Sequence, residues 1–490
     1  MRIWRTIDNE KGVAMVLAML MLLTLTGLLT AYLSVSAYEP QISKNLADTA
    51  RARYLAEAGI EIGLNVLVGT GDAGDTFTPA LVGATATNPW VTLVNAGTLS
   101  GVTTGGTAAE GTFAGTYTVT VRNDYQNGDN VLTGGLAGTN AAPNETLTSD
   151  SNKIVIMRSA GTFNGATKTI EVVVRRGNLP PMPGAVNLPG VQTDTYINKS
   201  SFDIDGRDYG CSSNCDTASN WALTNTNNKY GIATDPGNQS NLSSTTYEQN
   251  VQNGLTATSS SCNSSCATSK QNSVHGTDQT SSSTPKATTN GVNTVAADSS
   301  LTPTNLQAYL EAVKNYAGTT ILQSTMACPM QLTGSSTPTS TPTLTNGCSG
   351  SSGVNQTLDL GSRTNPKLVY FKGQIDTSSA FTGLTLNSGI KGAGVLVIED
   401  GDLKNLGNLT WDGVVIVTGH YVGAGFMANS STLIRGALIA NEKQAGEASG
   451  FFEFYLDGSA TSFTVHQSKQ NVDMVQLMKG NHTITNWREL

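Results

Sequence analysis

Charged and aromatic side chains are scarce in this sequence. Of its 490 residues, only 13% are Asp, Glu, Lys or Arg, and only 6% are Phe, Trp or Tyr. The formal net charge is −8, so the chain lacks the basic surface that nucleic-acid binding requires, and we expect no nucleic-acid partner. Gly, Ser, Thr and Asn are abundant instead. This composition suits an exported, loop-rich β protein better than a cytosolic enzyme.

Motifs for catalysis and metal binding are also missing. The four histidines are scattered and none has the spacing of an HExxH motif (His275, His420, His466 and His482). There is no GxSxG motif, no P-loop and no dinucleotide fingerprint at a strand–helix turn. We therefore expect no enzyme, no catalytic residue, no metal site and no cofactor.

A long uncharged run near the N-terminus is the strongest feature present. Residues 13–38 contain no charged side chain, and a polar leader of residues 1–12 with three basic residues precedes them. At about 1.5 Å per residue, a helix of this length spans roughly 39 Å, more than the hydrocarbon core of a bilayer. The run therefore predicts a transmembrane helix in contact with lipid.

The helical pattern continues beyond the apolar run to residue 67. Apolar residues recur every four positions, with charged residues between them, at Ile42, Leu46, Ala50, Tyr54, Ala58 and Ile62. We expect one helix over residues 13–67 whose second half is amphipathic, lies outside the membrane and packs on a β-sheet.

Three interpretations of the N-terminus compete. Val35-Ser36-Ala37 is compatible with cleavage of a secretory signal peptide, but the apolar run exceeds the usual 7–15 or so residues of such a signal. A plain single-span anchor is the simplest alternative. The third is a short charged leader that ends in Gly12 and is removed before the helix, so that the mature chain begins at Val13.

The third interpretation rests on a resemblance. The segment Asn9-Glu10-Lys11-Gly12, followed by Val13-Ala14-Met15-Val16-Leu17 and later by Ala56-Glu57-Ala58-Gly59, resembles the N-terminus of the PilX-type minor pilin and type IV pilus assembly family. The resemblance implies cleavage between Gly12 and Val13 by a prepilin peptidase. It also implies a single-pass inner-membrane protein that later reaches the cell surface in a pilus. Its partners would be other pilin subunits and the inner-membrane assembly machinery.

The resemblance also places Leu17, Pro40 and Glu57 in the membrane and filament helix. Major pilins carry Glu as the fifth residue of the mature chain, where this sequence has Leu17. That Glu pairs with the N-terminal amine of a neighbouring subunit, and a buried charge is tolerated only when it is paired. A subunit with Leu17 has no such charge to satisfy, which favours the filament tip.

Three β segments predict a pilin-like head over residues 68–176. Residues 115–122, 153–158 and 167–175 are rich in Val, Ile and Thr and are linked locally, so we expect an antiparallel meander laid against the helix. Residues 177–188 contain three prolines in four positions and predict a linker. The fragment Asp124 to Asp129 resembles part of a calcium loop without its downstream acidic ligand.

Residues 189–366 are rich in Ser, Thr and Asn and contain all six cysteines. Only 303–317 has a clear helical pattern, with Thr302 or Thr304 as a possible cap. In an exported chain we expect disulfides, most simply Cys211–Cys215, Cys262–Cys266 and Cys328–Cys348. Six cysteines allow 15 pairings, and a four-thiolate zinc site or free thiols are the alternatives.

Residues 367–490 are repetitive. Gly394-Val-Leu-Val-Ile398, Gly413-Val-Val-Ile-Val417 and Gly436-Ala-Leu-Ile-Ala440 are near-copies, offset by 19 and 23 residues. Residues 367–371 begin the series and 460–466 extend it. Short apolar strands at this period predict β-solenoid rungs, and a β-sandwich with uneven strands is the alternative.

Together these features predict an α+β protein. It has a long N-terminal helix, a pilin-like antiparallel head and a distal, mainly β domain of solenoid type. The predicted function is a minor pilin-like subunit that takes part in type IV pilus assembly, at the tip, and displays the distal domain for adhesion or partner binding. A tip pseudopilin of a type II secretion system is one alternative, and a single-span surface adhesin that never polymerises is another.

Overall fold

The computed structural model divides the chain into two compact units. It describes residues 8–69, 76–99, 115–124, 146–177 and 179–490, the last range with gaps at 191–194, 199–200, 225, 239–244, 260–261, 277–294, 315–319, 326–327, 347–354, 375–382, 420–423, 427–429, 443–453, 457–461 and 479–481. The first unit comprises Met1–Thr70, Phe77–Val174 and Ile484–Leu490, and the second comprises Gly71–Thr76 and Arg175–Thr483. Most of the second unit is therefore an insertion into the first. The predicted 367–490 domain is divided between the two, because the last residues join the first unit.

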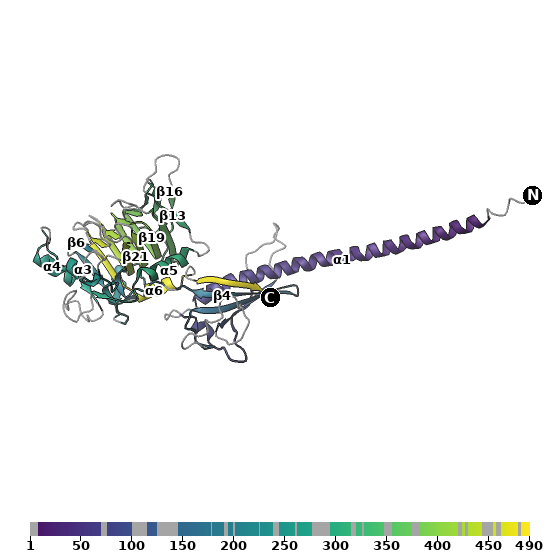
Figure 1. Ribbon diagram of the computed structural model, residues 1–490, viewed down its shortest axis with the longest axis horizontal. Helices are drawn as coiled ribbons and strands as arrows, with labels where there is room; N and C mark the ends of the chain where they lie inside the picture. Colours follow the sequence, from purple (N-terminus) through teal and green to yellow (C-terminus); the bar gives the residue numbers. More distant parts are fainter. Residues whose placement is uncertain are drawn as a thin grey trace, which may run out of the picture. The chain divides into compact units, whose positions relative to one another are not determined.

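Helix α1 (Asp8–Gly69) is the first element of the first unit, in purple in Figure 1. It is continuous, as the apolar run and the charged pattern behind it predict. Pro40 lies inside it and leaves the carbonyl one turn earlier without a donor. An 18-residue window within Val13–Leu67 has a mean hydropathy of 2.3, and the helix is long and apolar enough to cross a membrane.

A five-stranded sheet completes the first unit. The predicted meander is confirmed, and two further strands flank it in the order β1-β2-β3-β4-β26. The last strand, β26, is the yellow strand beside β4 in Figure 1. The β1–β2 and β2–β3 pairs are antiparallel. The elements are η1 (Thr78–Leu81), β1 (Val91–Gly97), β2 (Thr116–Asn123), β3 (Ile154–Phe163), β4 (Ala166–Arg176) and β26 (His482–Glu489).

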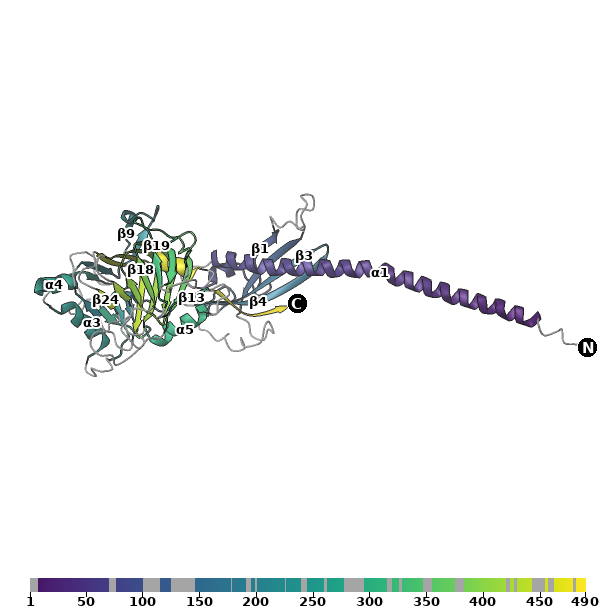
Figure 2. The same ribbon diagram turned by 90° about the horizontal axis from the view of Figure 1, so that it is seen from above.

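Helix α1 packs on this sheet through small residues. A Cβ on Gly59 would collide with Ser159 of β3, one on Gly63 with Val119 and Met157, and one on Gly161 of β3 with the helix backbone at Ala52. The helix therefore lies very close to β2 and β3. Figure 2 shows it running along the strands of this unit.

The helix face that packs is not the predicted one. The buried apolar side chains of the helix are Ala52, Leu55, Ala56, Ile60, Leu64 and Leu67, whereas Ile42, Leu46 and Tyr54 of the predicted stripe are exposed. The four-residue recurrence does not mark the core face, because Ala and Gly alternate with Leu and Ile on the face that packs. These small residues give a weak hydrophobic pattern but permit close packing.

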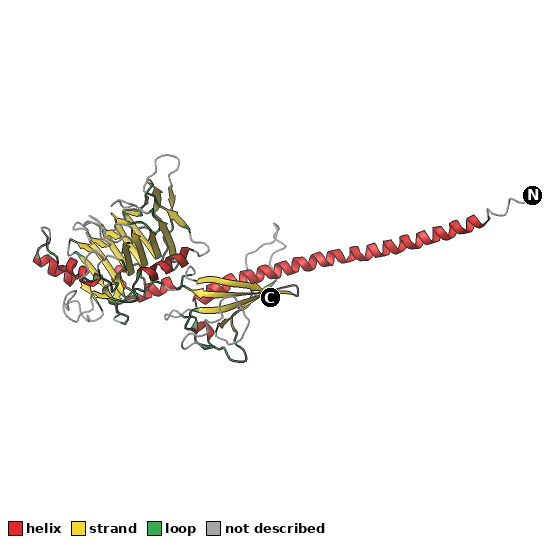
Figure 3. Cartoon of the chain, in the orientation of Figure 1, coloured by secondary structure: helices red, strands yellow, loops and turns green. Residues whose placement is uncertain are grey.

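The second unit is built mostly of short strands, seen in yellow in Figure 3. Its helices are η3 (Ala218–Asn220), α3 (Tyr247–Thr256), α4 (Ser264–Asn272), α5 (Pro303–Lys314) and α6 (Lys469–Gln476). Its strands are β5 (Gly184–Leu188), β6 (Thr195–Ile197), β7 (Phe202–Asp205), β8 (Tyr209–Cys211), β9 (Trp221–Leu223), β10 (Tyr230–Thr234), β11 (Val274–His275), β12 (Val295–Ala297), β13 (Ile321–Gln323), β14 (Met330–Thr333), β15 (Thr343–Asn346), β16 (Asn355–Thr357), β17 (Lys367–Lys372), β18 (Leu384–Asn387), β19 (Gly389–Glu399), β20 (Leu403–Asn405), β21 (Asn408–Gly419), β22 (Ala424–Phe426), β23 (Ser431–Glu442), β24 (Phe454–Leu456) and β25 (Ser462–Gln467).

From β17 to β25, successive strands alternate between two mainly parallel sheets. One sheet has the path β11-β7-β25-β23-β21-β19-β17-β13, with β5, β10 and β12 beside it, and the other has the order β16-β15-β14-β18-β20-β22-β24-β6. The near-copies pair in register, so that Gly394 lies opposite Gly413, and Gly413 opposite Gly436. Strands β6 and β7 extend the same sheets, so the Ser/Thr/Asn-rich region and the repeats share one unit. Its assignment to the β-solenoid class stays a prediction.

The glycines of the repeat form a column across three strands. Gly394, Gly413 and Gly436 have φ values of 119°, 135° and 145°, which L side chains rarely adopt. A Cβ on Gly436 would collide with the carbonyl oxygen of Gly413, and one on Gly413 with that of Gly394. Beside the column, the buried Trp411 donates from Nε1 to the Gly394 carbonyl over 3.1 Å. The packing of neighbouring repeats therefore depends on the backbone conformation of these glycines as well as on the burial of apolar side chains.

Helices α5 and α6 cover the outer face of the first of these sheets. Leu306, Tyr309 and Leu310 of α5 and Val475 of α6 pack on apolar side chains of β17, β19, β21 and β23. The predicted helix at 303–317 is confirmed over Pro303–Lys314, and the Thr302 hydroxyl accepts from the Asn305 amide over 3.2 Å as expected of a cap.

The two ends of the insertion meet at a buried histidine. Arg176 Nε donates to His482 Nε2 over 3.3 Å, and His482 Nδ1 donates to the Met478 carbonyl over 3.2 Å. This pattern requires a neutral ring. Burial, helped by the nearby Arg176 charge, lowers the pKa of His482 to about 4.

Adding a methyl group to the glycine column should destabilise the second unit. We expect Gly413→Ala to lower its free energy of unfolding by at least about 2 kcal/mol, since the backbone conformation is strained for Ala and the Cβ has no space. Gly210→Ala is the control, because Gly210 has no positive φ and its Cβ would approach only a side-chain methyl, that of Thr224, and no backbone atom. Thermal unfolding of the full chain in detergent measures both, and equal stability of the two variants would contradict the role of the column.

The second unit should lose stability in mild acid. Below a pH of about 6.5 the unfolded chain protonates His482, whereas the folded chain does so only near pH 4. Stability is therefore complete above the unfolded pKa and falls by about 3 kcal/mol as pH drops towards 4. Denaturant titrations of the wild type and of His482→Gln at pH 7.5 and 4.5 check this. Parallel losses in both proteins would show that His482 is not responsible.

Candidate functional site

The exposed surface of α1 is the first candidate site. Every described side chain from Val13 to Ala47 is exposed in the isolated chain, and up to Tyr38 none is charged. Apolar area left in water costs roughly 25 cal/mol per Å². A bilayer or apolar protein surfaces must therefore cover this half of the helix.

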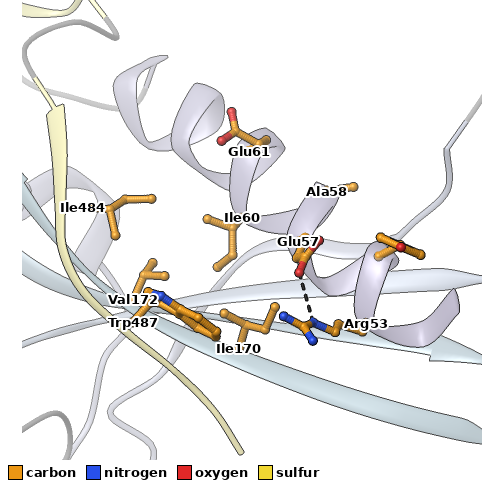
Figure 4. A pocket seen from close by; sticks show the side chains of 10 residues that line it. Arg53, Glu57, Ala58, Ile60, Glu61, Ile170, Val172, Ile484 and Trp487 are labelled. Carbon is orange, nitrogen blue, oxygen red and sulfur yellow. Dashed lines mark hydrogen bonds and ion pairs between the residues drawn. The ribbon is translucent and has the colours of Figure 1, made fainter. Parts of the chain in front are cut away.

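An apolar groove beside the second half of α1 is the other candidate. It has a volume of about 480 Å³ and lies between the helix and strand β26 of the same unit (Figure 4). Its floor is Ile60 of the helix with Ile170 and Val172 of β4. Its outer wall is formed by Ile484 and Trp487 of β26. The remaining lining residues are Arg53, Tyr54, Glu57, Ala58 and Glu61.

The aromatic side chains of the groove are unusually exposed. Trp487 is 58% exposed and Tyr54 is 63% exposed, and the Trp487 ring lies beside Ile170 and Val172 (Figure 4). Large aromatic residues that remain exposed around an apolar floor are typical of surfaces that bind a partner.

The charges at the rim of the groove are paired with one another. Arg53 Nε lies 3.1 Å from Glu57 Oε1 and 3.7 Å from Glu489 Oε2. Lys168 Nζ lies 2.7 Å from Glu489 Oε1. The hydrogen bond from Lys168 lowers the pKa of Glu489, and the Arg53 charge acts in the same direction. Four of the charges beside the apolar floor thus form ion pairs with one another, and Glu61 lines the groove as well.

The predicted helix residues are distributed along α1. Gly12 lies within helix α1. Val13, which follows the predicted cleavage point, lies in the same helix and is exposed. Leu17 is exposed, and Pro40 follows the uncharged run. Of these residues, only Glu57 lines the groove. The wall formed by β26 was missed, because nothing in residues 482–489 indicates a partner more than 300 positions earlier.

Two of the predicted disulfides are confirmed. Cys211–Cys215 and Cys262–Cys266 are closed, with Cα–Cα distances of 5.7 Å and 5.1 Å. Cys328 is also disulfide-bonded, and its predicted partner Cys348 lies outside the described residues. The first two pairs therefore offer no thiolate to zinc. The calcium-like fragment is described only at Asp124, whose carboxylate accepts from the Asn152 side chain over 2.9 Å.

The fold gathers two of the scattered histidines on the outer face of the second unit. His466 Nε2 lies 2.9 Å from Asp203 Oδ2, and His275 Nε2 lies 3.8 Å from Asp203 Oδ1. The Tyr209 ring stacks on His466, with ring centroids 4.0 Å apart. Neighbouring Asp205 is buried, which alone would raise its pKa, but the hydrogen bonds from Arg207 hold it below its usual value. In the part of the chain that is described, no group of three or more His, Cys, Asp and Glu is arranged to hold a metal ion.

Comparison with known proteins leaves the family of the chain open. No family model matches the sequence, and no curated protein is significantly similar to it. Among solved structures, the competence-associated pilin ComZ from Thermus thermophilus matches at 10% sequence identity with a TM-score of 0.22, covering 90% of this chain and 97% of that chain. Similarity at this level carries no inference about fold or function.

Proposed function

We propose that the chain is a pilin-like filament subunit, held in the inner membrane by α1 before assembly and packed against other subunits through α1 afterwards. The observation that carries this proposal is the continuity of α1. One helix has an exposed, uncharged half and a second half that forms the core of a β head. The exposed half can move from lipid to an apolar filament core without exposing charge to either.

The finer proposal is a PilX-type minor pilin of a type IV pilus, located at or near the tip. Leu17 supports it, because this side chain cannot neutralise the amine of a neighbouring subunit and a buried unpaired amine is costly. The insertion of residues 175–483 supports it as well, since a unit of that size crowds a packed shaft. We assign this unit, as a β-solenoid, to adhesion or to binding other minor subunits, with no enzymatic activity.

The in-register repeats support the solenoid assignment. Each repeat contributes one strand to each sheet, and its glycines align with those of the next repeat. Parallel strands that bury a continuous core between neighbouring repeats are the physical basis of solenoids.

A tip pseudopilin of a type II secretion system remains the second candidate. Such subunits share the helix and also often lack the charge at the position of Leu17. The genes adjacent to this one distinguish the two, because pilus and secretion operons differ. A single-span adhesin is the third candidate, and it differs from both in needing no leader cleavage.

Processing at Gly12 tests the proposal. If a prepilin peptidase acts, the mature chain begins at Val13, and Gly12→Val leaves the leader attached because a bulkier side chain obstructs the scissile bond. N-terminal sequencing of the membrane-bound protein measures this, with Gly27→Val as the control for a change within the same helix. A mature chain that begins at Tyr38 would instead show a signal peptide and refute the pilin proposal.

Position in the filament is a separate prediction. We expect the subunit at low copy number and at or near one filament end, the tip, because Leu17 and the inserted unit both oppose an internal position. Immunogold labelling with antibodies to residues 175–483 measures this. Labelling along the whole shaft would refute the tip assignment, and so would unchanged filament numbers and adhesion after deletion of the gene.

A further inference from the structure

We infer that the sheet running from β16 to β6 in the second unit binds a neutral, linear carbohydrate on its outer face. This inference rests on the proposed function, because it names the ligand class of the unit that is assigned to adhesion. The site is a row of residues, one from each strand, which we call the polar row. Its central members are Gln331, Thr385, Lys404, Gly425, Tyr455 and Tyr196.

The polar row faces away from the core. Successive residues of a strand point to opposite faces of the sheet. The residues that precede and follow the row, such as Leu386, Leu403 and Phe454, are buried in the interior between the two sheets. The row therefore lies on the other face, and its five side chains are partly exposed.

The length of the row suits a linear polymer. The pairing continues from Gln331 to Thr345 of β15 and Asn355 of β16, so the row crosses eight strands. At about 4.8 Å between strands, eight strands span roughly 34 Å. Strands β18 and β24, which the row crosses, are labelled in Figure 2. A surface that repeats one side chain per strand over this distance matches a ligand that is itself extended and repetitive.

Two tyrosines form the aromatic end of the row. The rings of Tyr196 and Tyr455 are stacked, with centroids 4.9 Å apart and planes inclined by 11°. A tyrosine combines an apolar ring with a hydroxyl group and loses little conformational entropy on binding. A sugar ring has the complementary chemistry, since its C–H groups pack on aromatic rings and its hydroxyl groups form hydrogen bonds.

The charge of the sheet selects a neutral ligand. Within the described bounds of its eight strands, this sheet contains a single charged residue, Lys404. A surface that meets only water gains solubility from many charges, and this face does not have them. One cation provides neither the basic surface for nucleic acid nor several contacts for an acidic polymer.

The polar side chains of the row also disfavour an apolar partner. Gln331 and Thr385 carry an amide and a hydroxyl, which both donate and accept hydrogen bonds. An apolar protein surface placed over them would leave these groups unpaired, which is costly. The hydroxyl groups of a neutral carbohydrate can satisfy both, and we therefore assign the face to this class of ligand.

A binding screen with the purified full chain in detergent tests this inference. The probes are immobilised neutral oligosaccharides, such as glucose, mannose and galactose polymers, beside sulfated and uronic-acid oligosaccharides. We expect binding to neutral chains, and calorimetry then measures the affinity for the best of them. Tyr455→Ala should lower that affinity about tenfold or more, as loss of an aromatic anchor commonly does. Tyr230→Ala is the control and should leave it unchanged, because Tyr230 is also partly exposed but belongs to β10 of the other sheet.

A second variant guards against unfolding. Thr385→Val keeps the shape of the side chain and removes its hydroxyl, so we expect a severalfold loss of affinity without disturbance of the tyrosine pair. Thermal unfolding is measured for every variant. If Tyr455→Ala unfolds at a lower temperature than the wild type, Tyr455→Phe and Thr385→Val decide the result.

The outcomes separate the inference from the proposed function. If no neutral oligosaccharide binds, or if folded Tyr455 and Thr385 variants bind as well as the wild type, the carbohydrate inference is wrong and the filament function stands. Binding only to sulfated or uronic-acid chains would also overturn it. A mature chain that begins at Tyr38 would refute the pilin proposal and leave the binding result unchanged.

Discussion

The close contact between α1 and strands β2 and β3 is the constraint on which the first unit depends. Gly59 and Gly63 on the helix and Gly161 on the sheet leave no room for side chains, so the two backbones approach more closely than larger residues permit. This contact sets which helix face is buried. The larger side chains on the other face of the helix, including Tyr54, are therefore exposed.

The packing of the second unit also depends on positions that lack a side chain. In the repeats, glycines with positive φ stack across neighbouring strands, and the Trp411 ring occupies the space left by Gly392. Apolar side chains of both sheets then fill the interior. Both units therefore use the absence of side chains at a few positions to fix the placement of many others.

Local patterns in the sequence predicted much of this architecture. The extent of α1, strands β2 to β4, helix α5 and the repeated strands were each specified by a contiguous run of residues with a regular period. The Cys-x-x-x-Cys pairs also close as predicted, because each partner lies one helical turn or one tight loop away.

Contacts between distant residues were not predictable in this way. Strand β26 joins β4 across an insertion, and Asp203 meets His275 and His466 from three different strands. No periodic pattern in the sequence predicts such contacts. The sequence pattern did not predict the packed face of α1 for a related reason. Ala and Gly on that face add little to the hydrophobic pattern, although they permit the closest packing.

The insertion between β4 and β26 also imposes an order on folding. The edge strand of the first unit is synthesised after the whole of residues 175–483. Closing so long a loop is entropically expensive while the insertion is unfolded. Once that unit has folded, its two ends are held near each other by Arg176 and His482, and the cost of adding β26 falls. A chain interrupted before residue 484 lacks the wall formed by Ile484 and Trp487, so the groove forms only after β26 has been synthesised.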